Sequence, residues 1–291
     1  MLLLHTPHCT AYGNASRPEQ PARLARTVPH LRAAHPDWIW QEPPLATATD
    51  AALCHTPAHL ERLLVPEDFD ADTPFFPDIA THAYRATGAA IAAAEAALAG
   101  RGPVIALNRP PGHHATADQP MGFCYLNQIA IAARHAQLHL GATRVAVWDF
   151  DAHHGNGTEA LLADQPGFLF TSVHQSPCYP GTGLTSFSNC HNWPIPPLAP
   201  RAAHLDALRH SLDAVIAFDP DLVLVSAGFD AYQGDPITNM TLQTTDFATL
   251  GSWLRTSGLP AAAVLEGGYS ADLPQLVDAF LSAWAGEDVR A

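Results

Sequence analysis

Short apolar runs alternate with longer amphipathic segments along this chain. The apolar runs predict strands at 1–6, 104–107, 144–150, 168–173, 221–226 and 261–265. The amphipathic segments predict helices at about 21–34, 79–99, 125–140, 157–163, 205–216, 247–254 and 276–284. Two shorter helices are expected, one capped by Asp50 and one starting near 55–59, whereas 35–50, 65–78 and 174–200 are predicted to be irregular.

The predicted strands are continuous apolar runs and do not alternate between apolar and polar residues. This pattern is typical of a parallel sheet that helices cover on both faces. We therefore expect an α/β fold of three layers, α/β/α, around a mostly parallel central sheet. No repeat and no linker divides the sequence, so residues 1–291 are expected to form a single domain.

Composition and charge argue against several classes of function. The formal net charge is −14 and only 14% of the residues are charged, which argues against a nucleic-acid partner and leaves cationic substrates open. The five cysteines are scattered and lack C-x-x-C spacing, which fits a reducing compartment. The apolar start is too short for a signal peptide and no run approaches a membrane span. We expect a cytoplasmic protein without a membrane partner.

Polar side chains follow each predicted central strand. The carboxyl ends of parallel strands meet at one edge of the sheet, where ligands of such folds bind. Small residues accompany these groups and allow close approach. The sequence thus predicts one site built from several strand ends. The groups are His113 and His114 after 104–107, Asp149, Asp151, His153 and Asn156 around the end of 144–150, His174 after 168–172, Asp230 after 222–226, and Glu266 and Tyr269 after 261–265.

Three of these residues predict a metal site. Asp151, His153 and Asp230 offer two carboxylates and one imidazole, which leaves one position of a tetrahedral zinc ion open, as catalytic sites do. The alternative is that Asp151 caps a helix and that His153 is a hydrogen-bonded core histidine. That alternative explains neither of the neighbouring polar groups, so we favour the metal.

Six motifs follow one another between residues 109 and 269: Arg109-Pro-Pro-Gly-His-His-Ala115, Gly122-Phe-Cys-Tyr-Leu-Asn127, Asp149-Phe-Asp-Ala-His-His-Gly-Asn-Gly-Thr158, Pro180-Gly-Thr-Gly183, Ser226-Ala-Gly-Phe-Asp-Ala231 and Glu266-Gly-Gly-Tyr269. In this order they resemble the zinc-dependent histone deacetylase family, which belongs to the arginase/deacetylase superfold. With Asn156, the third motif is more similar to the class II and bacterial branch of the family, which includes acetylpolyamine amidohydrolases. Gly228 stands where arginase-like enzymes need a carboxylate for a second metal ion, so one divalent ion is expected.

The resemblance implies a role for each residue of the predicted site. One Zn²⁺ would be held by Asp151, His153 and Asp230, although Fe²⁺ or Co²⁺ also suits such ligands. His114 would act as general base and acid, with His113 as its electrostatic partner. The residues that complete the catalytic set are Asp149, which would orient His113, Asn156, which would orient His114, and Tyr269, which would donate a hydrogen bond to the oxyanion.

The resemblance also implies a substrate tunnel and a structural K⁺ site. Ile237 stands where some polyamine-specific members carry a glutamate, which disfavours polyamines. Arg17-Pro18-Glu19 departs from the His-Pro-Glu of many relatives, so the contribution of this first loop to the site stays open. The expected tunnel residues are Gly122, Phe123, Tyr179, Ile237 and Gly268, with Asp72 at the rim. The expected K⁺ ligands are Asp149, Asp151, His153, Ser172 and Val173.

The expected activity is hydrolysis of an acyl amide, with acetyl as the favoured acyl group and a lysine side chain of a peptide or protein as the favoured amine. A second hypothesis is deacylation of small amines such as acetylated polyamines. A third is a non-catalytic module that binds acyl-lysine. The third is disfavoured because such a module would be free to lose Tyr269 or a metal ligand, and this chain retains them all.

Overall fold

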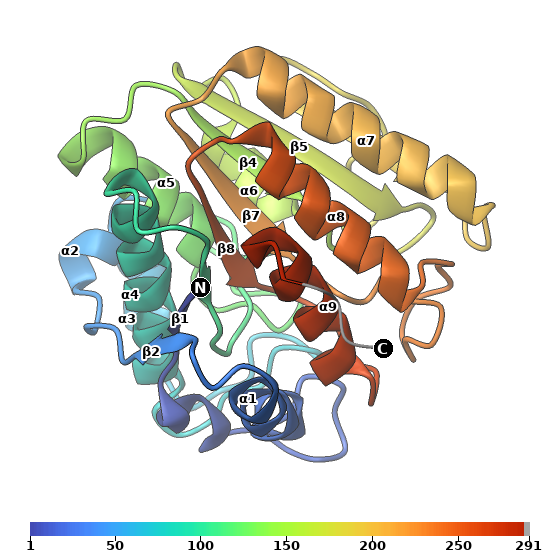
Figure 1. The fold of residues 1–291 in the computed structure, drawn as a ribbon. Helices are drawn as coiled ribbons and strands as arrows, with labels where there is room; N and C mark the ends of the chain where they lie inside the picture. Colours follow the sequence, from blue (N-terminus) through green and yellow to red (C-terminus); the bar gives the residue numbers. More distant parts are fainter. Residues whose placement is uncertain (288–291) are drawn as a thin grey trace.

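A computed structural model describes residues 1–287 and contains one eight-stranded parallel sheet (Figure 1). The strand order is β2-β1-β3-β8-β7-β4-β5-β6. The predicted parallel α/β fold is therefore confirmed. The strands are β1 (Leu2–Leu4), β2 (Ile39–Gln41), β3 (Val104–Ala106), β4 (Val145–Asp149), β5 (Phe168–Gln175), β6 (Cys190–Ile195), β7 (Leu222–Ala227) and β8 (Ala261–Leu265).

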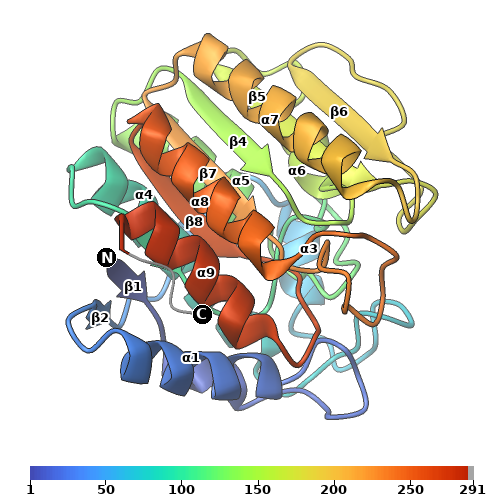
Figure 2. The ribbon, with the colours of Figure 1, turned by 45° about the vertical axis from the view of Figure 1, so that its right-hand side comes forward.

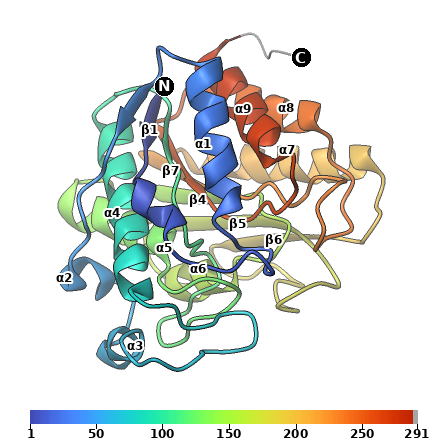
Figure 3. The ribbon, with the colours of Figure 1, turned by 90° about the horizontal axis from the view of Figure 1, so that it is seen from below.

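Helices cover both faces of the sheet. The first face carries α4 (Ile79–Leu98), α5 (Gln128–His139) and the shorter α6 (Asn156–Leu162). The opposite face carries α1 (Ala22–Ala34), α7 (Arg201–Phe218), α8 (Thr244–Ser257) and α9 (Leu273–Ala285), and Figure 2 shows α7, α8 and α9 in front of the sheet. Figure 3, seen from below, places α4 and α1 on opposite sides of β1. Three short helices complete the set: η1 (Pro7–Thr10), α2 (Ala48–Ala51) and α3 (Pro57–Arg62).

Strand β4 explains why the central strands read as continuous apolar runs. Its side chains alternate between the two faces, yet each face is packed by helices. Val145 and Val147 enter the core under α4 and α5, whereas Ala146 and Trp148 enter the core under α7, α8 and α9. All four residues are completely buried. A strand buried on both faces needs no polar positions until it ends.

Four sequence predictions need correction. The edge strands β2 and β6 lie in segments that were predicted to be irregular. Strand β2 has only three residues, which is too short for a recognisable pattern. Strand β6 mixes polar residues with Pro194, which an edge strand tolerates. Asp50 is not a helix cap: Thr47 caps α2 and accepts from the Asp50 backbone N–H, while the Asp50 carboxylate accepts from Thr47 in return. His174 lies within β5, which continues to Gln175.

The strand order brings the predicted site together. Strands β3, β8, β7, β4 and β5 are consecutive neighbours, and all run in the same direction. Their carboxyl ends therefore share one edge of the sheet. That edge carries the segments from 107–114, 149–156, 228–230 and 266–269. Among the described residues, no helix is both long and apolar enough to cross a membrane.

A buried ion network ties the N-terminal segment to this edge. Arg109 is completely buried and donates two hydrogen bonds of 2.5 Å to the Glu19 carboxylate. Arg23 donates to Glu19 at 3.3 Å, to the Gly268 carbonyl at 2.8 Å and to the Glu266 carbonyl at 2.5 Å. Burial raises the pKa of Glu19, but the Arg109 and Arg23 guanidiniums outweigh it and hold this pKa below its usual value. Glu19 is the shared anion that balances two buried cations.

Glu19→Gln is expected to lower the free energy of unfolding by about 3–5 kcal/mol, because it leaves two buried guanidiniums without a counter-charge. Urea denaturation measures this loss. Asp213→Asn is the control, because it breaks an exposed pair with Arg209 in α7 and should cost no more than about 0.5 kcal/mol. An equal loss of stability in the two variants would contradict the proposed importance of the network.

The same network predicts a pH dependence. Because the folded pKa of Glu19 lies below its unfolded value, its stabilisation is fully present above the unfolded pKa and disappears as the pH falls through the folded pKa. The difference between wild type and Glu19→Gln should therefore shrink in acid.

Candidate active site

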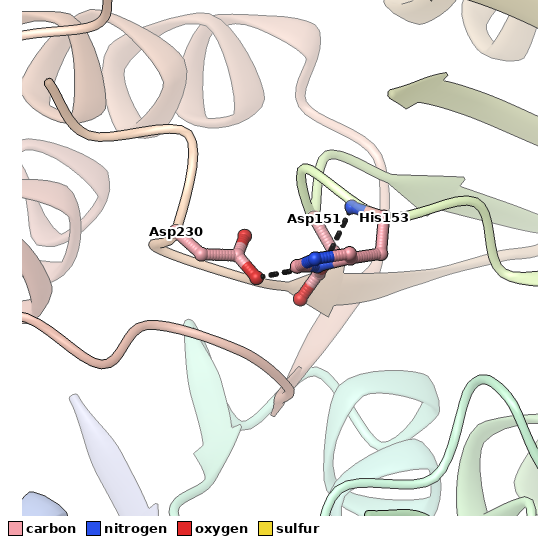
Figure 4. Close-up of side chains that lie close together, drawn as sticks. All are labelled: Asp151, His153 and Asp230. Carbon is pink, nitrogen blue, oxygen red and sulfur yellow. Dashed lines mark hydrogen bonds and ion pairs between the residues drawn. The ribbon is translucent and has the colours of Figure 1, made fainter. Parts of the chain in front are cut away.

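Asp151, His153 and Asp230 lie close together at the ends of β4 and β7 (Figure 4). One ligand atom of each lies within 4.8 Å of the others. His153 Nδ1 is 2.9 Å from Asp230 Oδ2 and 3.2 Å from Asp151 Oδ1. Both carboxylates are completely buried and His153 is 7% exposed. Two buried carboxylates facing one imidazole form a donor set that suits a divalent metal ion.

Backbone groups and glycines shape this cluster. The second oxygen of each carboxylate accepts from a backbone N–H: Gly267 donates to Asp151 at 2.7 Å, and Ala152 donates to Asp230 at 2.8 Å. A Cβ on Gly228 would lie 2.0 Å from Asp151 Oδ2, and one on Gly267 would lie 2.2 Å from Asp230 Oδ2. Only glycine allows the neighbouring strands to come this close to the carboxylates.

The pKa shifts in this cluster indicate that its carboxylates need a nearby positive charge. Burial raises the pKa of Asp230, and the Asp151 carboxylate raises it further. Burial lowers the pKa of His153, but Asp230 and Asp151 outweigh it and raise this pKa well above its ordinary value. Without a metal, a proton on His153 thus supplies the balancing charge. A divalent ion would displace that proton, so the residues present fit a metal.

His113 and His114 form a second, adjacent cluster in which their rings have different partners. His113 Nδ1 donates to Asp149 Oδ2 at 3.0 Å, and its Nε2 lies 3.8 Å from Asp151 Oδ1. His114 Nδ1 donates to the amide oxygen of Asn156 at 2.8 Å. The Asn156 amide nitrogen in turn bonds the His114 carbonyl at 3.3 Å, which fixes the direction of the amide. One histidine therefore faces a carboxylate and the other a neutral amide.

Burial and the surrounding charges shift the pKa values of the two imidazoles in opposite directions. Burial lowers the pKa of His113, but the Asp151 and Asp149 carboxylates raise it to about 10. Burial and the charge on His113 lower the pKa of His114 well below its ordinary value. His114 is therefore neutral with its proton on Nδ1, and its Nε2 carries a free lone pair. Of the two histidines, His114 is the one that can accept a proton near neutral pH.

The segment that follows β8 holds Tyr269 beside these groups. Its backbone N–H donates to Asp235 Oδ2 at 2.7 Å, and its ring meets the edge of Phe123 at 5.7 Å between centroids. The Arg23 guanidinium lies 4.8 Å from the ring centre. Burial raises the pKa of the Tyr269 hydroxyl well above its ordinary value, so the hydroxyl remains a hydrogen-bond donor.

A cavity of about 380 Å³ opens onto both clusters. Its volume is in the range of small-molecule sites. Five of the six predicted tunnel residues line it, together with His114, His153 and Tyr269. Gly268 is not among them, and its carbonyl accepts a hydrogen bond from Arg23. The five lining residues are Asp72, Gly122, Phe123, Tyr179 and Ile237.

Three lining residues were not anticipated as site residues: Arg17, Pro18 and Cys178. The change from His-Pro-Glu to Arg-Pro-Glu in the first loop is the sequence signal that pointed to Arg17. Cys178 precedes the lining residue Tyr179, but no pattern marked it. His174 lies away from the cavity: its Nδ1 contacts Ser172 Oγ at 2.9 Å and its Nε2 contacts the Gly183 carbonyl at 3.0 Å.

The predicted K⁺ ligands come from β4, β5 and the turn after β4. The pairing of these strands sets Ser172 opposite Asp149, and Val173 follows in β5. Asp149 Oδ1 already accepts from the Asp151 backbone N–H at 3.1 Å. The K⁺ site stays a prediction.

Zinc is expected to raise the melting temperature of the wild-type protein by at least about 3 °C when added well above its dissociation constant. Asp230→Asn should abolish this rise, because it removes an anionic ligand while keeping the size of the side chain. Asp213→Asn makes the same change at the surface and should keep the rise. Calorimetry with and without zinc measures all three, and an unchanged response of Asp230→Asn would exclude this metal site.

Comparison with known proteins agrees with this geometry. The Histone deacetylase domain family matches residues 17–284. A probable deacetylase of Methanothermobacter thermautotrophicus is 35% identical over 304 residues, which cover 99% of this chain and 92% of that protein. Among solved structures, the HDA15 HD domain is 29% identical, with a TM-score of 0.90 over 98% of this chain and 89% of that one. An acetylpolyamine aminohydrolase from Burkholderia pseudomallei is 28% identical, with a TM-score of 0.85 over 98% of both chains. The chain therefore belongs to the histone deacetylase family and has its arginase/deacetylase fold.

Proposed function

We propose that this protein is a zinc-dependent amidohydrolase that removes an acyl group, preferentially acetyl, from the side-chain amine of a lysine. The observation that carries the proposal is the position of the His114 imidazole, which bonds Asn156 through Nδ1 and lines the cavity beside the buried Asp151–His153–Asp230 cluster. A proton acceptor next to a metal-binding group is the arrangement that amide hydrolysis by water requires. Membership of a family of deacetylases supports the same reaction class.

In this proposal, Asp151, His153 and Asp230 hold one zinc ion. When bound, zinc supplies a Lewis acid that polarises the amide carbonyl and lowers the pKa of water. His114 Nε2 accepts the proton of the attacking water and then donates it to the leaving amine. The products are a carboxylate and the protonated amine, so one water is consumed for each amide bond broken and both of its protons end on the amine.

The remaining residues prepare the charges for this proton transfer. His113 stays protonated beside Asp149, and its positive charge keeps the pKa of His114 low until the negative oxyanion forms. Asn156 holds the proton of His114 on Nδ1, so that Nε2 is free to act. The Tyr269 hydroxyl donates to the carbonyl oxygen as negative charge develops there. Glu266 positions the histidine segment, since its carboxylate accepts from the Gly112 and His113 backbone N–H groups at 2.7 and 3.2 Å.

The cavity walls suit the methylene chain of an acyl-lysine. Phe123 and Tyr179 are aromatic, and the Tyr179 ring meets the edge of His114 at 5.2 Å between centroids. Aromatic faces favour an apolar chain that carries a polar group at its end. The likeness to an acetylpolyamine aminohydrolase gives a second candidate, the acetylated polyamines. Ile237 disfavours it, because an apolar wall residue offers no counter-charge to a second ammonium.

Two further parts of the proposal concern ions and compartment. Asp149, Asp151, His153, Ser172 and Val173 bind a structural K⁺ that offsets the negative charge behind the catalytic cluster. The protein works in the cytoplasm, which its five free cysteines support, because free thiols persist in a reducing compartment.

Tyr269→Phe is expected to lower kcat by about 100- to 1,000-fold while KM changes little, because the hydroxyl acts on the transition state. Acetate release from an acetyl-lysine peptide by the zinc-loaded protein measures both constants, with acetylpolyamines assayed alongside. The control is Tyr232→Phe, which removes a hydroxyl that bonds Asp272 at 3.0 Å outside the cavity. A change in KM alone would refute the oxyanion role. Absence of acetate release from every acylated amine would refute the function.

A further inference from the structure

The mouth of the cavity carries one cation and one anion. Arg17 and Asp72 line the cavity, and both are more exposed than His114 and His153, which are 4% and 7% exposed at its inner end. Arg17 Nη1 donates to the Ala71 carbonyl at 2.9 Å. Because Ala71 directly precedes Asp72, this bond holds the guanidinium beside the segment that carries the carboxylate. The two charges therefore belong to one entrance, built from two separate loops.

Both charges have unused binding capacity. A guanidinium has five N–H donors, and that of Arg17 makes one hydrogen bond and no ion pair with the described residues. The Asp72 carboxylate likewise accepts no hydrogen bond from the described residues, whereas its backbone N–H donates to Asp70 Oδ1 at 2.8 Å. Of the cavity-lining residues that the structure describes, Arg17 is the only arginine, in a chain with a net charge of −14. A cation placed here in so acidic a protein indicates recognition of an anion.

The pair of charges distinguishes three kinds of acylated amine. An acyl-lysine inside a peptide presents no charge at its α-carbon. An acetylated polyamine presents only a cation, which Asp72 attracts and Arg17 repels. A free acylated diamino acid presents an ammonium and a carboxylate on the same carbon, which match Asp72 and Arg17 respectively. Its methylene chain would lie between Phe123 and Tyr179, with the acyl amide at the inner end of the cavity.

We propose that the preferred substrate is a free Nε-acylated lysine, or a close homologue, whose α-carboxylate pairs with Arg17 and whose α-ammonium pairs with Asp72. This inference rests on the proposed deacylase function and names its substrate class. Arg17 acts as a specificity residue: its guanidinium offers a planar pair of N–H donors to a carboxylate, which a single carbonyl acceptor such as Ala71 does not use up.

Four substrates with the same acetamide and methylene chain test the inference. They are Nε-acetyl-lysine, its α-carboxamide, its Nα-formyl derivative and N-acetylcadaverine, which lacks the carboxylate altogether. The zinc-loaded wild type should favour Nε-acetyl-lysine over the carboxamide by at least about fivefold in kcat/KM. Raising the ionic strength from about 0.01 to about 1 M should reduce this preference, because exposed charges are screened.

Variants assign each charge to its partner. Arg17→Gln keeps a donor for the Ala71 carbonyl but removes the charge, so it should bring the carboxylate-to-carboxamide ratio of kcat/KM close to one. Asp72→Asn should instead reduce the ratio between the free and the formylated α-amine. Arg101→Gln removes an exposed arginine outside the cavity wall and should preserve both ratios.

The outcomes separate this inference from the proposed function. Equal rates for Nε-acetyl-lysine and its carboxamide in the wild type would overturn the inference while the deacylase function stands. So would an Arg17→Gln variant that slows all four substrates by the same factor, because that result indicates a structural role. Absence of acetate release from these compounds and from acetyl-lysine peptides would overturn the deacylase function and the inference with it.

Discussion

The structure depends on keeping the carboxylates of Asp151 and Asp230 completely buried and close together. Isolated buried charges are costly, and two of the same sign cost more. The fold offsets part of this cost through backbone N–H groups from neighbouring strands and through glycines that let those strands approach. A positive charge is needed to offset the rest of this cost. A proton on His153 provides one, and a divalent metal provides two, so the arrangement favours metal binding.

The two histidines differ in their hydrogen-bond partners and in the charges that surround them. Asp149 and Asn156 are nearly the same size and bond the same ring atom, Nδ1, of their respective histidines. Burial disfavours a proton on both imidazoles, but the Asp151 and Asp149 carboxylates outweigh it at His113, whereas the charge on His113 adds to the effect of burial at His114. Adjacent residues on one segment thus obtain opposite protonation states. The proposed mechanism needs this difference, because one imidazole must accept a proton while the other stays charged.

Central features could be predicted from the sequence because they depend on local pattern. Strand β4 is apolar until it ends at Asp149, so its end and the polar groups beyond it are visible in the sequence. Parallel strand ends share an edge, which predicts that residues 113, 151, 230 and 269 converge. The family resemblance is confirmed, as is the fold. The individual roles of the site residues stay proposals, which the geometry supports.

Other features depend on contacts between distant segments and were missed or left open. The edge strand β6 has no apolar run, because it is covered less completely than the central strands. The change from His-Pro-Glu to Arg-Pro-Glu drew attention to Arg17, but the contribution of the first loop to the cavity wall depends on how that loop lies against residues 71 and 72. Asp50 was assigned the wrong capping position because its carboxylate acts in reciprocal bonds with Thr47.

Titration of metal-free protein with zinc, with bound metal and acetate release measured in the same samples, tests the proposed mechanism most directly. The mechanism predicts that activity is absent without metal, rises in proportion to bound zinc and stops rising at one ion per chain, as three protein ligands around one open position imply. Full activity in the metal-free protein, or activity that rises only after a second ion binds, would contradict it.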